Sequence, residues 1–344
     1  MLDRNLRDRY SRQTIFPGIG EVGQAKLLRS RAVVIGCGAL GGNIAGALVR
    51  AGVGNVSIVD RDFIEYHNLA RQVLFDEEDI REGLPKAVAA ARHLARVNST
   101  VKVEGIVADV NFSNVEKLCA GADVILDGLD NVETRFLLND VALKHKIPWV
   151  YGGAIGASGM TMTVVPGRPP CFRCLHPITA APENAPTCET AGVVGTAPAV
   201  IGALQATEAL KILVGAAELN RSIIVLDVWR DTFERIRVAP REDCPTCGGR
   251  YEFLEKRFTT RVTPLCGQSR AVQVVDTTVG RVDLAGLAAG LREARNTQST
   301  DYQLRFEVDE VEITVFPDGR AIIRNTLDAD RAQDLYRQYV RSRV

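Results

Sequence analysis

The feature that most constrains the fold is a glycine-rich turn between a short β-branched strand and an apolar helix. A strand is expected at Ala32–Ile35, the turn reads Gly36-Cys37-Gly38-Ala39-Leu40-Gly41, and the helix continues to Ala51. In such a turn the backbone can approach a phosphate, while the helix N-terminus offers free N–H groups and the positive end of the helix dipole. The pattern predicts that Gly36, Gly38 and Gly41 bind a nucleotide. The alternative is that these glycines only let the helix and the sheet pack closely.

Strands and helices alternate over roughly the first 150 residues. Further strands are expected at 56–59, 101–107, 124–126 and from 148, and further helices at 85–97 and 133–145. This alternation predicts an α/β fold with a doubly wound, mainly parallel, Rossmann-like sheet. Beyond residue 152 we expect strands at 160–165, 222–228 and 232–238 and a long apolar helix at 193–214. These strands should continue the sheet in antiparallel fashion.

The charge balance limits which partners the chain can have. Forty-two Lys and Arg residues face 42 Asp and Glu residues, so the formal net charge is zero, which argues against nucleic-acid binding. The first eight residues are too charged for a secretory signal peptide. The apolar stretch 193–214 carries Gln205, Glu208 and Lys211, and is therefore expected to be a buried helix rather than a membrane span. We expect a cytosolic protein without a membrane partner.

Acidic and basic residues follow the ends of the predicted parallel strands. Asp60 comes about 20 residues after the last glycine of the turn, where a carboxylate can hold ribose hydroxyls. Asp62, Arg71 and Lys86 follow, and Asp130 comes after the strand at 124–126, where it could hold Mg²⁺ on phosphates. This gathering favours a triphosphate with a metal ion over the nicotinamide dinucleotide of an NAD-dependent oxidoreductase. The alternative for each residue taken singly is a solvated surface pair.

Four of the eight cysteines form two Cys-x-x-Cys pairs, Cys171/Cys174 and Cys244/Cys247. In a cytosolic chain such pairs predict a tetrathiolate zinc site, and four thiolates leave no open position, so the role would be structural. The pairs stand about 70 residues apart, which suits a clamp between distant segments. The alternative is two redox-active pairs.

Several short motifs occur in a fixed order along the chain. They read Arg9-Tyr10-Ser11-Arg12-Gln13, the G-C-G-A-L-G turn, D-R-D at 60–62, N-L-A-R-Q at 68–72, G-L-P-K at 83–86 and D-G-L-D-N at 127–131. Together they make roughly residues 5–250 resemble the MoeB/ThiF/HesA family, bacterial relatives of the ubiquitin-activating enzymes. One departure is Ala39, where relatives often carry glycine, and it suits the helix because alanine is the best helix former.

The resemblance implies an enzyme that uses ATP and Mg²⁺ to adenylate the C-terminal glycine of a small ubiquitin-like sulfur carrier protein ending in Gly-Gly. Which carrier, and whether it serves thiamine, molybdopterin or another pathway, stays open. A cysteine desulfurase or other sulfur donor is a further implied partner. The implied site residues are Asp60 on the ribose, Asp62 near metal and phosphates, Asn68, Arg71 and Lys86 on the phosphates, Asp130 on Mg²⁺, and Arg12 reaching the ATP site of the neighbouring subunit of a homodimer.

Cys188 stands just before the long apolar helix, after a proline-rich stretch. A helix N-terminus lowers the pKa of a thiol and favours the nucleophilic thiolate. In some members of the family a cysteine in this loop forms a thioester or acyl-persulfide link with the carrier. The alternative is a small packed residue without chemistry.

The sequence predicts two domains, a nucleotide-binding adenylyltransferase domain at 1–250 and a small α+β domain at 251–344 without an assigned role. In the second we expect a strand at 271–275, a helix at 284–294, two strands meeting at Pro317-Asp318-Gly319 and a helix at 329–340. Nothing after Cys266 resembles the anion-binding loop of the rhodanese domain that some relatives carry. A non-catalytic scaffold that keeps the fold is a second alternative function, although Arg12, Arg71, Lys86 and Asp130 speak against it.

Overall fold

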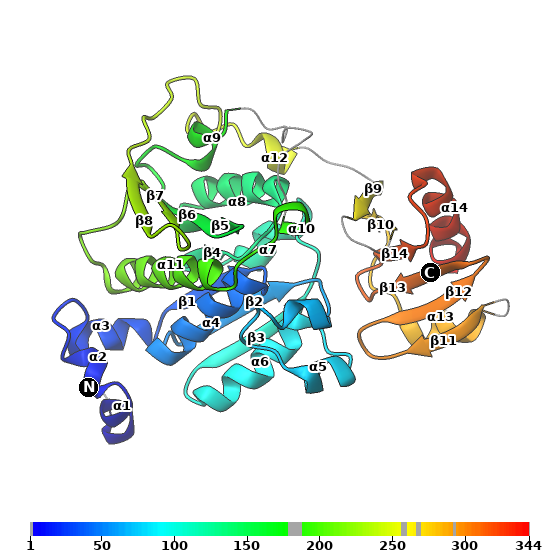
Figure 1. The fold of residues 1–344 in the computed structure, drawn as a ribbon, viewed down its shortest axis with the longest axis horizontal. Helices are drawn as coiled ribbons and strands as arrows, with labels where there is room; N and C mark the ends of the chain where they lie inside the picture. Colours follow the sequence, from blue (N-terminus) through cyan, green and yellow to red (C-terminus); the bar gives the residue numbers. More distant parts are fainter. Residues whose placement is uncertain (1–2, 178–187, 256–259, 266–269, 292–293, 344) are drawn as a thin grey trace. The chain divides into compact units, whose positions relative to one another are not determined.

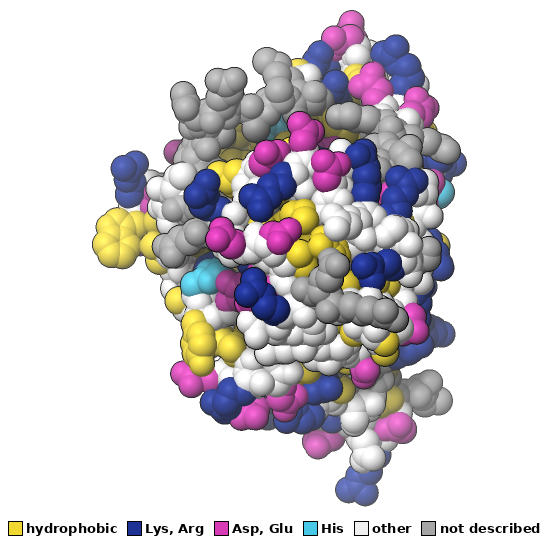
Figure 2. All heavy atoms as spheres, turned by 90° about the vertical axis from the view of Figure 1, so that its right-hand side faces the viewer, with side chains coloured by type: hydrophobic (Ala, Val, Ile, Leu, Met, Phe, Trp, Pro, Cys, Tyr) yellow, Lys and Arg dark blue, Asp and Glu magenta, His cyan; other side chains and the backbone are white. Residues whose placement is uncertain are grey.

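The computed structural model describes residues 3–177, 188–255, 260–265, 270–291 and 294–343, and divides into two units, Met1–Lys256 and Arg257–Val344. Cys266 lies outside the described residues. Each unit has its own sheet (Figure 1). The face drawn in Figure 2 intersperses acidic and basic side chains, as the zero net charge leads one to expect.

The described residues of the first unit form an eight-stranded sheet in the order β3-β2-β1-β4-β5-β6-β7-β8. The first five strands along the chain run parallel: β1 (Arg31–Ile35), β2 (Asn55–Asp60), β3 (Lys102–Val107), β4 (Val124–Asp127) and β5 (Trp149–Ile155). The last three continue the sheet in antiparallel pairing: β6 (Ser158–Val164), β7 (Ile223–Asp227) and β8 (Thr232–Ile236). The predicted doubly wound sheet with antiparallel continuation is confirmed.

Helices cover both faces of this sheet. Residues of α4 (Ala39–Ala51), α6 (Lys86–Val97) and α11 (Thr196–Val214) form one buried core with one face, and α7 (Val115–Cys119) and α8 (Val132–Lys144) form another with the opposite face. Because both faces are covered, the central strands are continuously apolar rather than alternating. Shorter helices complete the unit: α1 (Arg4–Arg9), α2 (Ser11–Thr14), α3 (Gly20–Leu27), η1 (Tyr66–Asn68), α5 (Glu77–Arg81), α9 (Phe172–Leu175), α10 (Cys188–Ala191) and α12 (Glu252–Glu255).

Among the described helices, α11 alone is long and apolar enough to cross a membrane by length and composition, and 56% of its most apolar 18-residue window is buried inside the structure. It contacts α4 and β5, and Gln205 and Glu208 are buried within it. Gln205 Nε2 donates to the backbone oxygens of Asp127 and Val150, which ties the helix to the sheet. The helix ends at Val214 and is capped by Gly215 in the left-handed conformation. The predicted buried helix is confirmed.

The described part of the second unit is a six-stranded antiparallel sheet, order β11-β12-β13-β14-β10-β9, with two helices whose apolar residues share its core. The elements are β9 (Thr260–Leu265), β10 (Ala271–Asp276), α13 (Leu284–Gly290), β11 (Arg295–Ser299), β12 (Leu304–Val308), β13 (Val311–Val315), β14 (Ala321–Arg324) and α14 (Ala329–Tyr339), followed by η2 (Arg341–Arg343). The α+β class and the hairpin at Pro317-Asp318-Gly319 are confirmed. The sequence missed β9, β11 and β12, and α13 ends at Gly290 rather than 294.

Candidate functional site

The glycine-rich turn leaves β1 and enters α4, with Gly38 as the residue before the first helical turn. Gly36 has φ +90°, and a Cβ there would lie 2.5 Å from the backbone oxygen of Gly128. A Cβ at Gly41 would lie 1.9 Å from the oxygen of Gly36. At Gly38, by contrast, the nearest atom to such a Cβ is Gln72 Nε2 at 3.7 Å. Two glycines are therefore needed for close packing, whereas Gly38 leaves open backbone at the helix N-terminus.

Asp60, the last residue of β2, ties the glycine turn to the neighbouring strand. Its Oδ2 accepts a hydrogen bond from the Cys37 N–H at 2.6 Å, and its Oδ1 accepts one from the Asp62 N–H at 2.7 Å. Burial and the charge of Asp62 raise the pKa of Asp60, while Lys86 and the two backbone N–H groups act to lower it. Each carboxylate oxygen keeps acceptor capacity for a further donor such as a hydroxyl.

Lys86 is a buried cation at the start of α6. Its side chain is 8% exposed and its Nζ lies 3.3 Å from Asp62 Oδ2. Burial alone would lower the pKa of Lys86, but Asp62 and Asp60 outweigh it and the pKa is raised, so the ammonium stays charged. Nearby, Arg61 Nη1 pairs with Asp109 Oδ1 at 2.6 Å. The carboxyl ends of β1 and β2 thus carry a fixed positive charge among carboxylates.

The loop after β4 places Asp130 beside these charges. Asp130 is exposed, and its charge raises the pKa of Arg61, Lys86 and Arg135. The preceding Leu129 is held at both its backbone groups: its N–H donates to Asp127 Oδ1 at 2.9 Å and its oxygen accepts from Arg135 Nη2 at 2.5 Å. The direction in which Asp130 leaves the sheet is therefore fixed by its neighbours.

Asp127 and Arg135, which hold this loop, form a buried ion pair that the sequence analysis did not single out. Arg135 Nε lies 3.1 Å from Asp127 Oδ2, and Arg135 Nη2 also donates to the Gly152 oxygen at 2.9 Å. Burial raises the pKa of Asp127 to about 6, although Arg135 acts to lower it. Two features of the sequence could have indicated this ion pair: Asp127 is an acid at the end of an apolar strand, and Arg135 is a basic residue among apolar positions of the next helix.

The segment after η1 carries the next predicted phosphate ligands. Asn68 is buried and its Oδ1 accepts from the Glu65 N–H at 3.0 Å, while the half-buried Arg71 donates to the His67 oxygen at 2.8 Å. Gln72, in the same motif but not among the predicted site residues, is 4% exposed. Its Oε1 has no hydrogen-bond partner in the described part of the chain. Gln72 thus adds an unsatisfied amide oxygen, and its amide nitrogen lies beside the open backbone of Gly38.

Two predicted residues stand apart from this gathering. Arg12 is exposed on α2 and makes no hydrogen bond or ion pair with any of the predicted phosphate-side residues that the structure describes. Cys188 begins α10, and its side chain lies outside what the structure describes. The segment just after α10 is held by the Gly156 N–H, which donates to the Gly192 oxygen at 2.9 Å, and by the Val194 N–H, which donates to the Gly156 oxygen at 2.8 Å.

The two cysteine pairs meet in one cluster. Cys171 Sγ lies 4.0 Å from Cys174 Sγ and 3.7 Å from Cys244 Sγ, and Cys174 Sγ lies 3.7 Å from Cys247 Sγ. A tetrahedral ion with metal–sulfur bonds of about 2.3 Å needs sulfur–sulfur separations near 3.8 Å, so the four sulfurs fit zinc. Three of the cysteines are buried and Cys247 is exposed. The structure brings these four residues together, and the identity of the ion stays a prediction.

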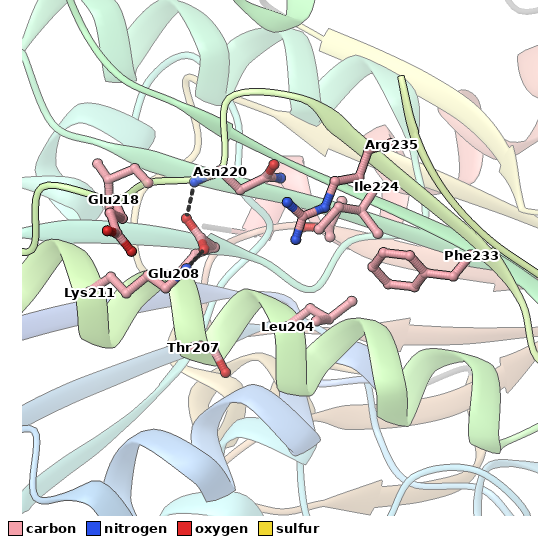
Figure 3. Close-up of a pocket in the computed structure, with 11 residues that line it drawn as sticks. Leu204, Thr207, Glu208, Lys211, Glu218, Asn220, Ile224, Phe233 and Arg235 are labelled. Carbon is pink, nitrogen blue, oxygen red and sulfur yellow. Dashed lines mark hydrogen bonds and ion pairs between the residues drawn. The ribbon is translucent and has the colours of Figure 1, made fainter. Parts of the chain in front are cut away.

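A surface cavity of about 310 Å³ lies elsewhere, between α11 and the antiparallel strands. Figure 3 shows Leu204 and Phe233 toward one end of it, and Lys211 and Glu208 on α11 toward the other. Glu208 accepts from Lys211 Nζ at 2.7 Å and from the Asn220 N–H at 2.8 Å, so its charge is satisfied within the protein. None of the predicted site residues lines this cavity.

The chain is similar to known proteins of one family. The family model described as ThiF family matches residues 10–246. The sulfur carrier protein ThiS adenylyltransferase of Bacillus subtilis is 41% identical over 97% of this chain and 100% of that protein. The SAMP-activating enzyme E1 of Haloferax volcanii is 42% identical over 72% of this chain and 91% of its own length.

Solved structures show the fold. The crystal structure of E. coli MccB with ATP covers 70% of this chain and 74% of that protein, with a TM-score of 0.61 and 24% identity. At this identity the likeness extends to the architecture alone. The shared architecture is a large, mainly parallel sheet that antiparallel strands continue.

Proposed function

Because the chain belongs to the ThiF family, we propose that it is an ATP- and Mg²⁺-dependent adenylyltransferase acting on the C-terminal glycine of a small ubiquitin-like sulfur carrier protein. The observation that carries the proposal is the buried Lys86, whose Nζ lies 3.3 Å from Asp62 Oδ2 and whose charge acts on Asp60 and on Cys37 of the glycine turn. In the same turn, Gly38 leaves open backbone at the N-terminus of α4. A buried ammonium with an adjacent helix N-terminus suits a polyphosphate rather than a neutral ring.

The chemistry requires two anions to meet. A carboxylate oxygen of the carrier attacks the α-phosphorus of ATP, the bond from that phosphorus to the bridging oxygen breaks, and pyrophosphate leaves with the bonding electrons. The product is an acyl-adenylate, whose carbonyl carbon has a better leaving group than a free carboxylate. In this proposal Lys86, Arg71 and the N–H groups around Gly38 offset the repulsion, and no side chain acts as the nucleophile.

Further roles follow from the same arrangement. Asp60 would hold the ribose hydroxyls with the acceptor capacity left beside its two backbone hydrogen bonds. Asn68 would contact a phosphate, and Asp62 would lie near the metal. Asp130, exposed at the end of its fixed loop, would hold Mg²⁺, which when bound neutralises charge on the phosphates.

We include a homodimer in the proposal because the family resemblance implies that Arg12 reaches the ATP site of the neighbouring subunit. In agreement, Arg12 is exposed and forms no hydrogen bond or ion pair with the described phosphate-side residues of its own subunit. Arg12 would act on the ATP site of the second copy. A zinc ion would be bound by the two cysteine pairs. For Cys188 two roles stay open: it forms a covalent link to the carrier, or it only packs. A sulfur donor such as a cysteine desulfurase would act after adenylation, in the cytosol, in thiamine, molybdopterin or related sulfur-transfer biosynthesis.

The test is carrier-dependent ATP–pyrophosphate exchange, run with each candidate carrier of the same cell. Asp130→Ala should abolish exchange while far-ultraviolet circular dichroism and melting temperature stay those of the wild type. Asp301→Ala, which removes an exposed carboxylate of the second unit, is the matched control and should exchange normally. An NAD-dependent oxidoreductase would instead bind NAD without Mg²⁺, and a scaffold would show no exchange with any carrier. Full exchange by Asp130→Ala would overturn the metal role.

A further inference from the structure

Two neighbouring residues of α8 hold the two halves of the cysteine cluster. Asn139 and Asp140 are both 0% exposed, in a helix whose other buried residues include Phe136, Leu138 and Val141. Buried polar side chains in such surroundings need partners, because an unpaired one costs about 1–3 kcal/mol. Their partners show what the two residues do.

Asn139 serves the first pair. Its Nδ2 donates to Cys171 Sγ at 3.7 Å, and its Oδ1 accepts from the Phe172 N–H at 3.0 Å. One amide group therefore fixes both the sulfur of Cys171 and the backbone immediately after it, where α9 begins. An N–H donated to a thiolate sulfur also stabilises the charged form that binds a metal.

Asp140 serves the second pair. Its Oδ1 accepts from Thr246 Oγ1 at 3.1 Å, and its Oδ2 accepts from the Phe253 N–H at 2.8 Å. Thr246 lies between Cys244 and Cys247, so the carboxylate anchors the turn that carries both sulfurs and also the start of α12 behind it. Two consecutive positions of one helix thus hold segments that are about 70 residues apart in the chain.

We infer that Asn139 and Asp140 are positioning residues for a metal ion in the Cys171/Cys174/Cys244/Cys247 cluster, and that they set how fast the ion is lost. Held from one buried helix, the two pairs keep the separations that a tetrahedral ion needs. Loss of an outer hydrogen bond of this kind lowers metal affinity by about 10- to 100-fold in other sites. This role can be tested without the adenylation reaction, because the quantity measured is the rate at which the metal is released.

The experiment measures zinc release from the full-length, zinc-loaded protein to an excess of a chromophoric chelator. Asn139→Leu keeps a similar volume and removes both hydrogen bonds, and should release zinc about 10- to 100-fold faster than the wild type. Asn98→Leu is the matched control, because Asn98 is 1% exposed and bonds to Tyr10 Oη and the Val49 oxygen, away from the cluster. Asn98→Leu should lower the melting temperature about as much as Asn139→Leu does, without changing the rate of zinc release.

A second variant covers the case in which Asn139→Leu does not fold. Thr246→Val removes the hydroxyl that donates to Asp140 and leaves α8 unchanged, and it too should accelerate release. With Co²⁺ in place of Zn²⁺, the thiolate-to-cobalt absorption bands should shift in Asn139→Leu or Thr246→Val and stay in place in Asn98→Leu. Wild-type release rates in the variants that fold, or a wild-type protein purified without zinc that binds none on addition, would overturn the inference.

Discussion

The open space at Gly38 gives the sharpest test of the proposed nucleotide site. Gly38 has φ −80° and ψ −147°, so its φ is negative and its ψ lies just beyond the β region, and the methyl group of an alanine would meet nothing closer than Gln72 Nε2 at 3.7 Å. Gly38→Ala should therefore lower the free energy of unfolding by only about 1 kcal/mol. If phosphate approaches this backbone, the same methyl group blocks it, and the Kd for ATP with Mg²⁺ should rise at least about tenfold, or 1.4 kcal/mol.

Gly41→Ala is the companion change with the opposite outcome. Its Cβ would sit 1.9 Å from the Gly36 oxygen, so the turn must move by roughly 1 Å to reach an allowed contact. That turn is itself packed against Gly128, where a Cβ would lie 2.3 Å from the same oxygen. We expect Gly41→Ala to lose about 2–4 kcal/mol of unfolding free energy. Urea unfolding measures the free energy of unfolding of each variant, and isothermal titration calorimetry measures its Kd for ATP. Wild-type ATP binding by Gly38→Ala, or wild-type stability of Gly41→Ala, would refute the reasoning.

Two further predictions concern a buried carboxyl and the second subunit. Because burial raises the pKa of Asp127 to about 6, above its usual 3.8, the folded protein keeps this proton where the unfolded chain has released it. The contribution of Asp127 to the free energy of unfolding should thus fall by up to about 3 kcal/mol as pH rises from 4 to 6, and a carboxyl ¹³C titration midpoint near 4 would contradict this. Mixing and reassociating inactive Arg12→Ala and Asp130→Ala subunits should restore about a quarter of wild-type exchange, because half the dimers are mixed and one of their two sites is intact. No recovery would place Arg12 in its own subunit's site.

The elements predicted well from the sequence are those fixed by local chemistry. The bounds of α4 were predicted correctly because a glycine turn precedes it and a left-handed Gly52 ends it, and both signals are readable without knowing the rest of the fold. The strand β11 was missed because its side chains are all exposed and polar, so only its pairing with β12 makes it a strand. Exposed edge strands carry little apolar pattern.

The same distinction holds for the candidate site. Lys86 and Asp62 could be singled out because they lie in short motifs near strand ends, and the structure places them 3.3 Å apart. The ion pair of Asp127 with Arg135 could not, since nothing in the sequence says that two charges eight positions apart will both be buried. Gln72 was readable as part of a motif, but its unpartnered oxygen is a property of the folded chain.

The helix α8 shows why polar residues inside an apolar pattern are worth reading individually. At Arg135 it fixes the loop that carries Asp130, and one turn later Asn139 and Asp140 fix the cysteine cluster. A helix buried on all sides can hold such groups only where each finds a partner, so its polar positions mark what it supports. Since the proposed metal and the Asp130 loop are held by different side chains of one helix, loss of the metal should weaken folding while the residues around Gly38 keep their own contacts. A metal ion bound by the four cysteines would, in this arrangement, support the first unit without touching the reacting atoms.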